Sequence, residues 1–299
     1  MTQFIGLIAA PFTPFTSSGD LNLAAVPELL NGLVRDGVSG AFVAGTTGEG
    51  LSLTSDEREK LTEAWIAARK SHPQFRIIVH VGHVSAREAS RLAACAEKCG
   101  ADAIAALPPF YYKPASIDVA LAALAQVAGA APALPFFYYH IPSMTGVSFK
   151  MLDLLRAAAS KIPNFAGMKF THEDLSELQA CLQLDGGRFQ ILAGRDEMLL
   201  ATLAMGAKCA IGSTYNFNGP AYLRMIDAFA RKDHETARRL QYEINQFARL
   251  AQSFGGLRAS KFIMWKLRAD CGPVRPPLAP LSNDEMQRIE KELATLKIS

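Results

Sequence analysis

Two side chains near the middle of the chain could together carry out carbonyl chemistry. Lys169 directly follows a short apolar run at residues 165–168, so its amine either leaves the fold for solvent or is held inside it. Removing a lysine from water favours the neutral amine, a nucleophile that can form a Schiff base with a ketone. Residues 136–140 read Phe-Phe-Tyr-Tyr-His, and strand alternation points one of Tyr138 and Tyr139 inward. A phenol beside that amine would suit proton transfer; the alternative role for both tyrosines is core packing.

A glycine-rich segment follows an earlier apolar run. Residues 45–50 read Gly-Thr-Thr-Gly-Glu-Gly. The glycines let backbone amides approach an anion, and Thr46 and Thr47 add hydroxyl donors. The segment lacks the spacing of a Walker loop and of a dinucleotide-binding loop. It is therefore either a carboxylate-binding loop or an ordinary glycine turn.

Two later segments also place polar groups after apolar runs. Asp196 and Glu197 follow the run at 189–193, where acids either favour a helix start through the helix dipole or bind sugar hydroxyls. Residues 212–216 read Gly-Ser-Thr-Tyr-Asn after another run, at a place where barrel proteins often bind ligands. Between these alternatives the residues themselves do not decide.

The histidines and cysteines do not form a recognisable metal motif. His80 and His83 lie on and just past a predicted strand without an acidic partner at suitable spacing, so a structural role is the favoured interpretation. The five cysteines, an odd set, contain no Cys-x-x-Cys: they stand at positions 95, 99, 181, 209 and 271. This pattern predicts free thiols in a reducing compartment.

The elements that must position these groups alternate along the chain. Eight short apolar runs without helical period are typical of parallel strands buried on both faces. Amphipathic segments separate them, which predicts an α/β fold, a (β/α)8 TIM barrel; a doubly wound open sheet is the alternative. The runs lie at residues 5–10, 41–44, 77–81, 103–107, 134–139, 165–168, 189–193 and 209–211.

Helix signals support this alternation. Thr54 and Glu57 have the spacing of a capping box, Ser85 and Glu88 mark another helix start, and Gly100 is placed to end that second helix. After the eighth run the pattern becomes wholly helical. We expect a barrel over 1–218 and a C-terminal helical region over 219–299 that packs on it, because no low-complexity linker separates the two. The helices are expected at 219–231, 234–254, 258–270 and 283–296.

Composition narrows the class of protein. With 299 residues, 49% hydrophobic and 20% charged, the chain can bury a large core, which excludes disorder. A net charge of +3 without a basic cluster gives no reason to expect a nucleic-acid partner. The apolar stretch at 119–139 is interrupted by Gln126, Gly129, Pro132 and Pro135, so no membrane span is expected. No signal peptide is evident, and we expect a cytoplasmic protein.

Taken together, the strand-end motifs resemble the pyruvate-dependent class I aldolases, the family that includes N-acetylneuraminate lyase and dihydrodipicolinate synthase. Five motifs occur in the family's order, and the resemblance covers about residues 5–270. It implies a TIM barrel with C-terminal helices, a homotetramer, and no metal or organic cofactor. The motifs lie at 45–49, 139–142, 167–169, 194–197 and 212–216.

The resemblance also implies roles for single residues. Lys169 would form the Schiff base, Tyr139 would transfer protons, and Thr46 and Thr47 would hold the pyruvate carboxylate. The sugar-derived part of the substrate would contact a further set: Thr171, Gly194, Asp196, Glu197 and Ser213.

Within the family, segments 45–53 and 138–142 together with Asp196-Glu197 are most similar to the members that cleave sialic acids. The expected reaction is reversible cleavage of N-acetylneuraminate to N-acetylmannosamine and pyruvate. The alternatives are a 2-keto-3-deoxy sugar acid aldolase, a dihydrodipicolinate synthase, and a sugar-acid binding protein without catalysis. Arg195 and Met144 match no expected sugar contact, and Met144 stands where the synthases carry arginine.

Overall fold

The computed structural model describes residues 3–296, and in it eight parallel strands form a closed barrel. The strands follow one another in chain order, and β8 pairs with β1. The pairing of β8 with β1 confirms the predicted barrel, and the open-sheet alternative is wrong. Each predicted run overlaps one strand: β1 Gly6–Ala9, β2 Gly40–Val43, β3 Arg76–His80, β4 Ala103–Ala106, β5 Phe136–His140, β6 Phe165–Phe170, β7 Gln190–Ala193 and β8 Cys209–Gly212.

Alternation along the strands divides their side chains between the barrel interior and the outer helices. Phe137 and Tyr139 belong to the smaller buried cluster, which fills the interior together with Phe42. Their neighbours Phe136 and Tyr138 belong to the larger cluster that joins strands to helices. Tyr139 is therefore the tyrosine of the pair that faces inward.

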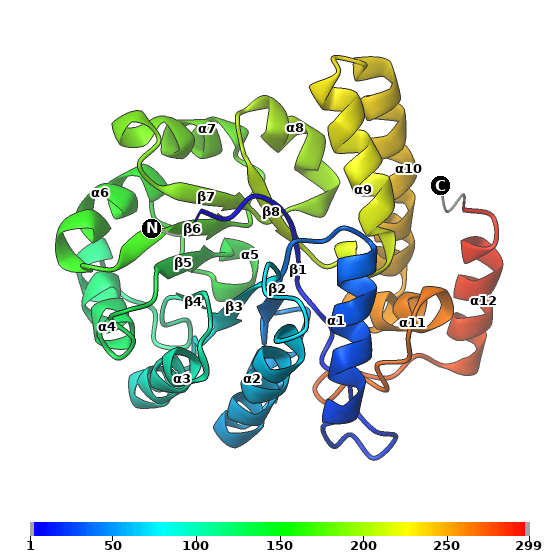
Figure 1. The fold of residues 1–299 in the computed structure, drawn as a ribbon, viewed down its shortest axis with the longest axis horizontal. Helices are drawn as coiled ribbons and strands as arrows, with labels where there is room; N and C mark the ends of the chain where they lie inside the picture. The colour runs from blue at the N-terminus through cyan, green and yellow to red at the C-terminus, as the bar shows by residue number, and fades with distance from the viewer. Residues whose placement is uncertain (1–2, 297–299) are drawn as a thin grey trace.

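Helices alternate with the strands and surround them (Figure 1). The predicted capping box at Thr54 and Glu57 is present, Ser85 accepts a hydrogen bond from the amide of Glu88, and Gly100 ends its helix with φ 90°. The helices are α1 Val26–Arg35, α2 Ser55–Arg69, α3 Ala86–Cys99, α4 Ile117–Gly129, α5 Pro142–Thr145, α6 Met151–Lys161, α7 Leu175–Gln183, α8 Leu199–Ala204, α9 Tyr215–Ala230, α10 His234–Ser253, α11 Leu257–Leu267 and α12 Asn283–Leu293, with 3-10 turns η1 Leu23–Ala25, η2 Gly50–Ser52, η3 Leu184–Gly186 and η4 Asp196–Met198.

The start of α9 corrects one expectation. We expected a helix from 219 and a polar loop over 212–216, but α9 begins at Tyr215. Asn218 leaves the helical conformation with φ −130°, so the chain can pass Pro220 inside the helix. α9 contacts α1, α8 and β1, which is the place of the barrel's eighth outer helix. The boundary that we expected after residue 218 falls inside this helix, and the division into two parts stays a prediction.

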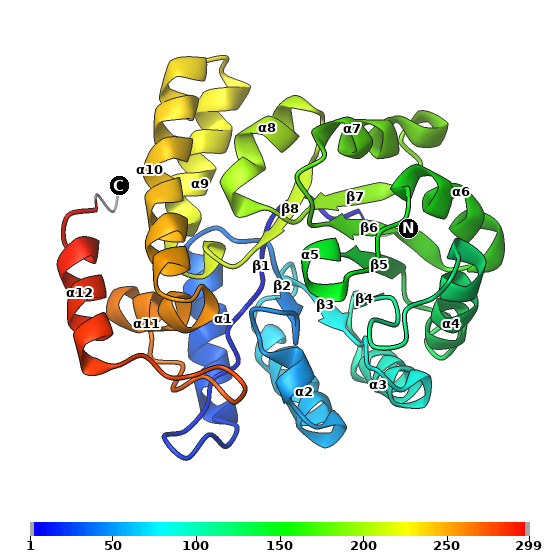
Figure 2. The same cartoon turned by 180° about the vertical axis from the view of Figure 1, so that it is seen from behind.

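The last three helices lie together on one side of the barrel, next to α9 (Figures 1 and 2). Two ion pairs connect this region to the start of the chain. Lys261 on α11 pairs with Glu49 after β2, and Arg275 beyond α11 forms a bidentate pair with Glu57 on α2. The Arg275 guanidinium lowers the pKa of Glu57 to about 2. Residues 1–2 and 297–299, the outer ends of the two expected parts, lie outside the described residues.

The structure also describes the state of the cysteines and the length and polarity of the helices. All five cysteines are free thiols, as predicted. Within residues 3–296 no helix combines the length and apolar character of a membrane span.

Candidate active site

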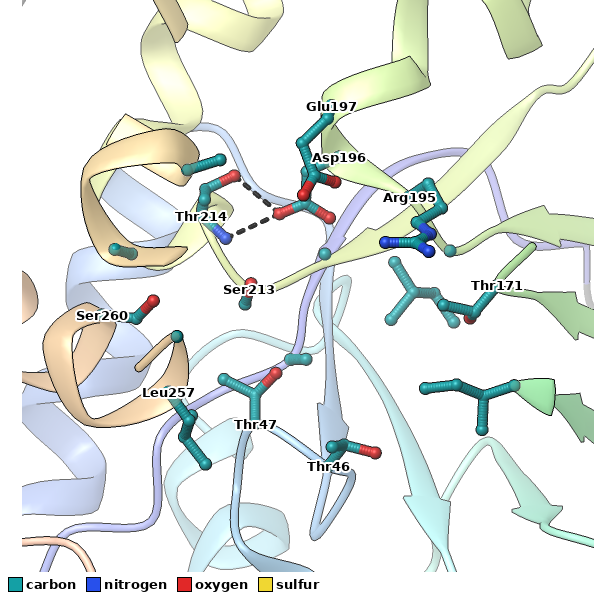
Figure 3. A pocket seen from close by; sticks show the side chains of 18 of the residues that line it. Thr46, Thr47, Thr171, Arg195, Asp196, Glu197, Ser213, Thr214, Leu257 and Ser260 are labelled. Carbon is teal, nitrogen blue, oxygen red and sulfur yellow. Dashed lines mark hydrogen bonds between the residues drawn. The ribbon is translucent and has the colours of Figure 1, made fainter. Parts of the chain in front are cut away.

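The carboxyl ends of the strands surround a cavity of about 250 Å³, and side chains from several loops point into it (Figure 3). Helices α10 and α11 contribute its other wall. The structure brings all nine predicted site residues to this cavity: Thr46, Thr47, Tyr139, Lys169, Thr171, Gly194, Asp196, Glu197 and Ser213.

Lys169 reaches the cavity from the interior face of β6. Its neighbours Met168 and Phe170 belong to the outer buried cluster, so alternation turns the lysine inward. The residue is only 4% exposed. Its amine lies 4.3 Å from the centre of the Phe42 ring and 4.4 Å from that of Tyr139. The lysine is therefore held inside the barrel mouth and does not emerge into solvent.

Tyr139 connects this amine to the glycine-rich loop. The Lys169 amine donates a hydrogen bond to the Tyr139 hydroxyl over 3.4 Å. The same hydroxyl is 3.1 Å from the hydroxyl of Thr46. The ring of Tyr139 packs edge-on against Phe42 and His80, which fixes its position on β5. A proton can thus pass between the amine, the phenol and a group bound at Thr46.

The loop after β2 has the properties of an anion site. Among the residues that the structure describes, the backbone amides of Thr46, Thr47 and Gly48 donate to no other group. Glu49 has the left-handed φ of 53°, and a Cβ on Gly50 would overlap the carbonyl oxygen of Ala44. This tight turn leaves the amides of Thr46 and Thr47, the two of these residues that line the cavity, available to a carboxylate.

The carboxylate of Glu49 holds the loop in place from behind. It accepts hydrogen bonds from the Lys261 amine at 2.9 Å and from the Arg275 amide at 2.8 Å. Both ionised side chains of the Glu49–Lys261 pair are nearly inaccessible to solvent. The C-terminal helices therefore position the loop that carries Thr46 and Thr47.

The opposite side of the cavity carries the acids. Asp196 is buried and accepts hydrogen bonds from the Thr214 amide at 2.8 Å and the Thr214 hydroxyl at 2.6 Å (Figure 3). Burial and the nearby Glu197 raise the pKa of Asp196 to about 6. Glu197 accepts a hydrogen bond from Gln252 of α10 at 3.0 Å. Each acid keeps acceptor capacity for a ligand.

Thr171 supplies a buried hydroxyl with no partner in the part of the chain that the structure describes. A Cβ at position 194 would overlap that hydroxyl, so the glycine is needed for the Thr171 side chain to keep this position. A buried hydroxyl of this kind costs free energy unless a ligand or a water satisfies it.

Arg195 lines the cavity and forms an ion pair with Glu173, which follows β6. Met144 on α5 is 66% exposed and is not among the lining residues. Tyr111 and Tyr112 are exposed, and their rings make an edge-to-face contact with each other in the loop after β4. Of these residues, Arg195 alone lines the cavity.

The cavity lining also includes residues that were not predicted as site residues, among them four whose side chains are polar or large. Thr214 adjoins the motif at 212–216 and orients Asp196, so its place beside Ser213 was the available signal. Gln252, Leu257 and Ser260 come from α10 and α11. Their helical segments have ordinary amphipathic patterns, and nothing in the sequence says that they face the strand ends.

The histidine pair is engaged in local structure. His80 is buried, and its Nδ1 lies 3.0 Å from the carbonyl oxygen of Ala44. Burial lowers the pKa of His80 well below its usual range, and the neighbouring Arg58 adds to the effect. Nδ1 of His83 accepts a hydrogen bond from the amide of Ser85. This arrangement supports the structural interpretation of both.

Comparisons with known proteins agree with this geometry. The model of the dihydrodipicolinate synthetase family matches residues 3–296. N-acetylneuraminate lyase of Homo sapiens is 41% identical over 295 residues, covering 97% of this chain and 92% of that protein.

Two solved structures are also similar. N-acetylneuraminate lyase of Proteus mirabilis is 36% identical, with a TM-score of 0.96 and full coverage of both chains. A catalytic lysine mutant of the Ruminococcus gnavus sialic acid aldolase is 26% identical, with a TM-score of 0.92, and the match covers 98% of this chain and 95% of that one. The chain belongs to the dihydrodipicolinate synthetase family.

Proposed function

We propose that this chain is a Schiff-base aldolase that cleaves N-acetylneuraminate reversibly to N-acetylmannosamine and pyruvate. The observation that carries the proposal is the buried Lys169 amine, which lies at hydrogen-bond distance from the Tyr139 phenol in the cavity at the carboxyl ends of the strands. The lyases of Homo sapiens and Proteus mirabilis, both similar over nearly the whole chain, support the choice of substrate. The Ruminococcus gnavus relative has a catalytic lysine, which supports the chemistry.

The first half of the reaction forms the covalent intermediate. The Lys169 amine adds to the C2 ketone of the open-chain sugar, and loss of water gives a protonated iminium. The substrate carboxylate binds the free amides at Thr46 and Thr47. That position is next to the Tyr139 hydroxyl, because Thr46 and Tyr139 are in contact.

The second half breaks the carbon–carbon bond. Tyr139 takes the proton of the C4 hydroxyl as it passes its own proton to the adjacent substrate carboxylate. The C3–C4 bond breaks, its electron pair forms an enamine with the iminium, and the aldehyde product N-acetylmannosamine leaves. Protonation of the enamine carbon restores the iminium, and water hydrolyses it to pyruvate and the free Lys169 amine. Because the iminium accepts the electron pair, the step requires neither a metal nor an organic cofactor.

The distal part of the substrate lies against the acidic side of the cavity in this proposal. Asp196 and Glu197 accept hydrogen bonds from sugar hydroxyls, and Thr171 and Ser213 add hydroxyl contacts. Gly194 leaves room for the sugar beside Thr171.

Reductive trapping tests the central step. Borohydride added with pyruvate should inactivate the enzyme and add one reduced pyruvate to the peptide that contains Lys169. Lys261 is an internal control, because it is equally buried but paired with Glu49. Label on Lys261 alone, or no label, would refute the proposed intermediate.

Assembly and location belong to the proposal as well. The family resemblance implies a homotetramer, which sedimentation equilibrium of the purified chain would test. The five free thiols support a reducing compartment, and we propose the cytoplasm.

A further inference from the structure

Two cysteines on the outer surface of the barrel face a glutamate on the neighbouring helix. Cys95 and Cys99 lie one helical turn apart on α3, so their side chains share one face. Their sulfur atoms are 3.8 Å apart. Glu63 on the adjacent α2 places a carboxylate oxygen so close that all three potential ligand atoms lie within 4.8 Å of one another.

The spacing of these atoms fits a tetrahedral metal ion. Zinc–sulfur bonds of about 2.3 Å at tetrahedral angles place two thiolates about 3.8 Å apart, which is the distance between Cys95 and Cys99. A disulfide would require the sulfurs to approach to about 2.05 Å. The two sulfurs therefore already have the separation that a shared tetrahedral ion requires.

We propose that Cys95, Cys99 and Glu63 bind one thiophilic divalent cation, of which Zn²⁺ is the expected one, with water as the fourth ligand. The sulfurs are partly buried and Glu63 is exposed, so the ion can enter from solvent. The bound ion would connect α2 to α3, two neighbouring helices of the outer layer (Figure 1). The cavity that holds Lys169 contains none of these residues.

The charges around the site suit a cation. Burial is the main cause that raises the pKa of Cys95 to about 12, and Cys99, Glu59 and Glu63 add to it. Cysteine binds a metal as the thiolate, so metal binding releases the proton of each thiol. Arg91, on the same helix as the two cysteines, is engaged by Glu59 and Asp56.

Cobalt titration tests the site on the whole chain. Protein stripped with a chelator and kept reduced by a phosphine should bind one Co²⁺ per chain, with the visible bands of tetrahedral thiolate coordination, and Zn²⁺ should displace it. Loss of an outer-shell partner typically weakens metal binding about 10–100-fold, so Cys95→Ser and Cys99→Ser should each weaken it at least as much. Cys181→Ser is the matched control, because Cys181 is a buried single thiol on α7.

A second measurement needs no variant. Zn²⁺ should protect Cys95 and Cys99 of the native protein from alkylation, as read from peptide masses. Pyruvate release should be the same with and without the metal, which keeps this test separate from that of the aldolase. Each of three results would overturn the proposal. The cobalt bands could be absent, they could persist unchanged in Cys95→Ser and Cys99→Ser, or Zn²⁺ could leave the alkylation of the two cysteines unaffected.

Discussion

The buried ion pair between Glu49 and Lys261 offers a direct test of how the C-terminal helices support the active site. The two side chains are 1% and 2% exposed. The Lys261 amine also donates to the carbonyl of Pro273 at 2.8 Å, and it lies 4.2 Å from the centre of the Phe15 ring. Burial lowers the pKa of Lys261, and Glu49 opposes this shift. The charged amine therefore depends on the carboxylate for its stability.

Lys261→Met keeps the length of the side chain and removes its charge, which leaves the Glu49 carboxylate buried with only the Arg275 amide as partner. Breaking one side of a buried pair costs about 3–5 kcal/mol. At about 2.1 cal/mol/K of unfolding entropy per residue, a cooperative unit of 299 residues should lose about 5–8 °C in Tm. Because Glu49 supports Thr46 and Thr47, pyruvate binding should weaken as well.

Thermal unfolding and pyruvate trapping would be measured beside a control on the same helix. Lys266→Met removes an exposed pair with Glu290, which is worth about 0–1 kcal/mol. The double variant Glu49→Gln with Lys261→Met leaves no unpaired charge and should recover part of the loss. If Lys261→Met lowers Tm no more than Lys266→Met does, the pair does not fasten the loop and the reasoning is wrong.

Three other outcomes concern the acidic side of the cavity and the choice of reaction. Burial raises the pKa of Asp196 to about 6, so the contribution of this carboxyl group to stability is full below the unfolded pKa of about 3.9 and is lost as pH rises through 6. The Tm of the native protein relative to that of Asp196→Asn should therefore fall over this pH range, and a constant difference would contradict the prediction. Glu197→Ala should lower kcat/KM for N-acetylneuraminate about 10–150-fold while pyruvate trapping changes little; equal losses would indicate a structural role. Met144 stands where the synthases carry arginine, and it neither carries a charge nor lines the cavity, so it offers no partner to a second substrate carboxylate. We therefore expect kcat/KM for condensing pyruvate with aspartate semialdehyde to be at least about a hundredfold below that for N-acetylneuraminate cleavage, and comparable values would assign the chain to the synthases.

The sequence predicts the barrel well because its strands are buried on both faces. Such strands are continuous apolar runs, and each run, from the one at β1 to the one at β8, was visible without knowledge of the fold. The carboxyl ends of parallel strands meet at one end of a barrel, so polar residues that follow the runs must converge. This is why the predicted positions of Lys169, Tyr139 and Asp196 meet at one cavity.

The parts that the sequence did not predict depend on contacts between distant segments. Gly219 and Pro220 favour a helix start at 219, but the irregular backbone at Asn218 lets α9 begin earlier, at Tyr215. The amphipathic pattern of α10 shows that one face is buried without showing against what, and so Gln252 was missed. The support of Glu49 by Lys261 joins residues 212 positions apart, and no local pattern encodes it.

Burial alone does not identify the nucleophile, since the structure contains two buried lysines among residues 3–296, Lys169 and Lys261. Lys261 is satisfied by the Glu49 carboxylate and a carbonyl oxygen, and a charged amine in such a setting cannot attack a ketone. Lys169 has the Tyr139 phenol as its hydrogen-bond partner, lies over the Phe42 ring and lines the cavity. The hydrogen-bond partner distinguishes the two lysines. An amine that contacts a hydroxyl and lines a cavity loses only a weak interaction when it forms an iminium, whereas the Lys261 amine would lose its ion pair. Selective labelling of Lys169 by pyruvate and borohydride, with Lys261 untouched, would follow from this difference in partners.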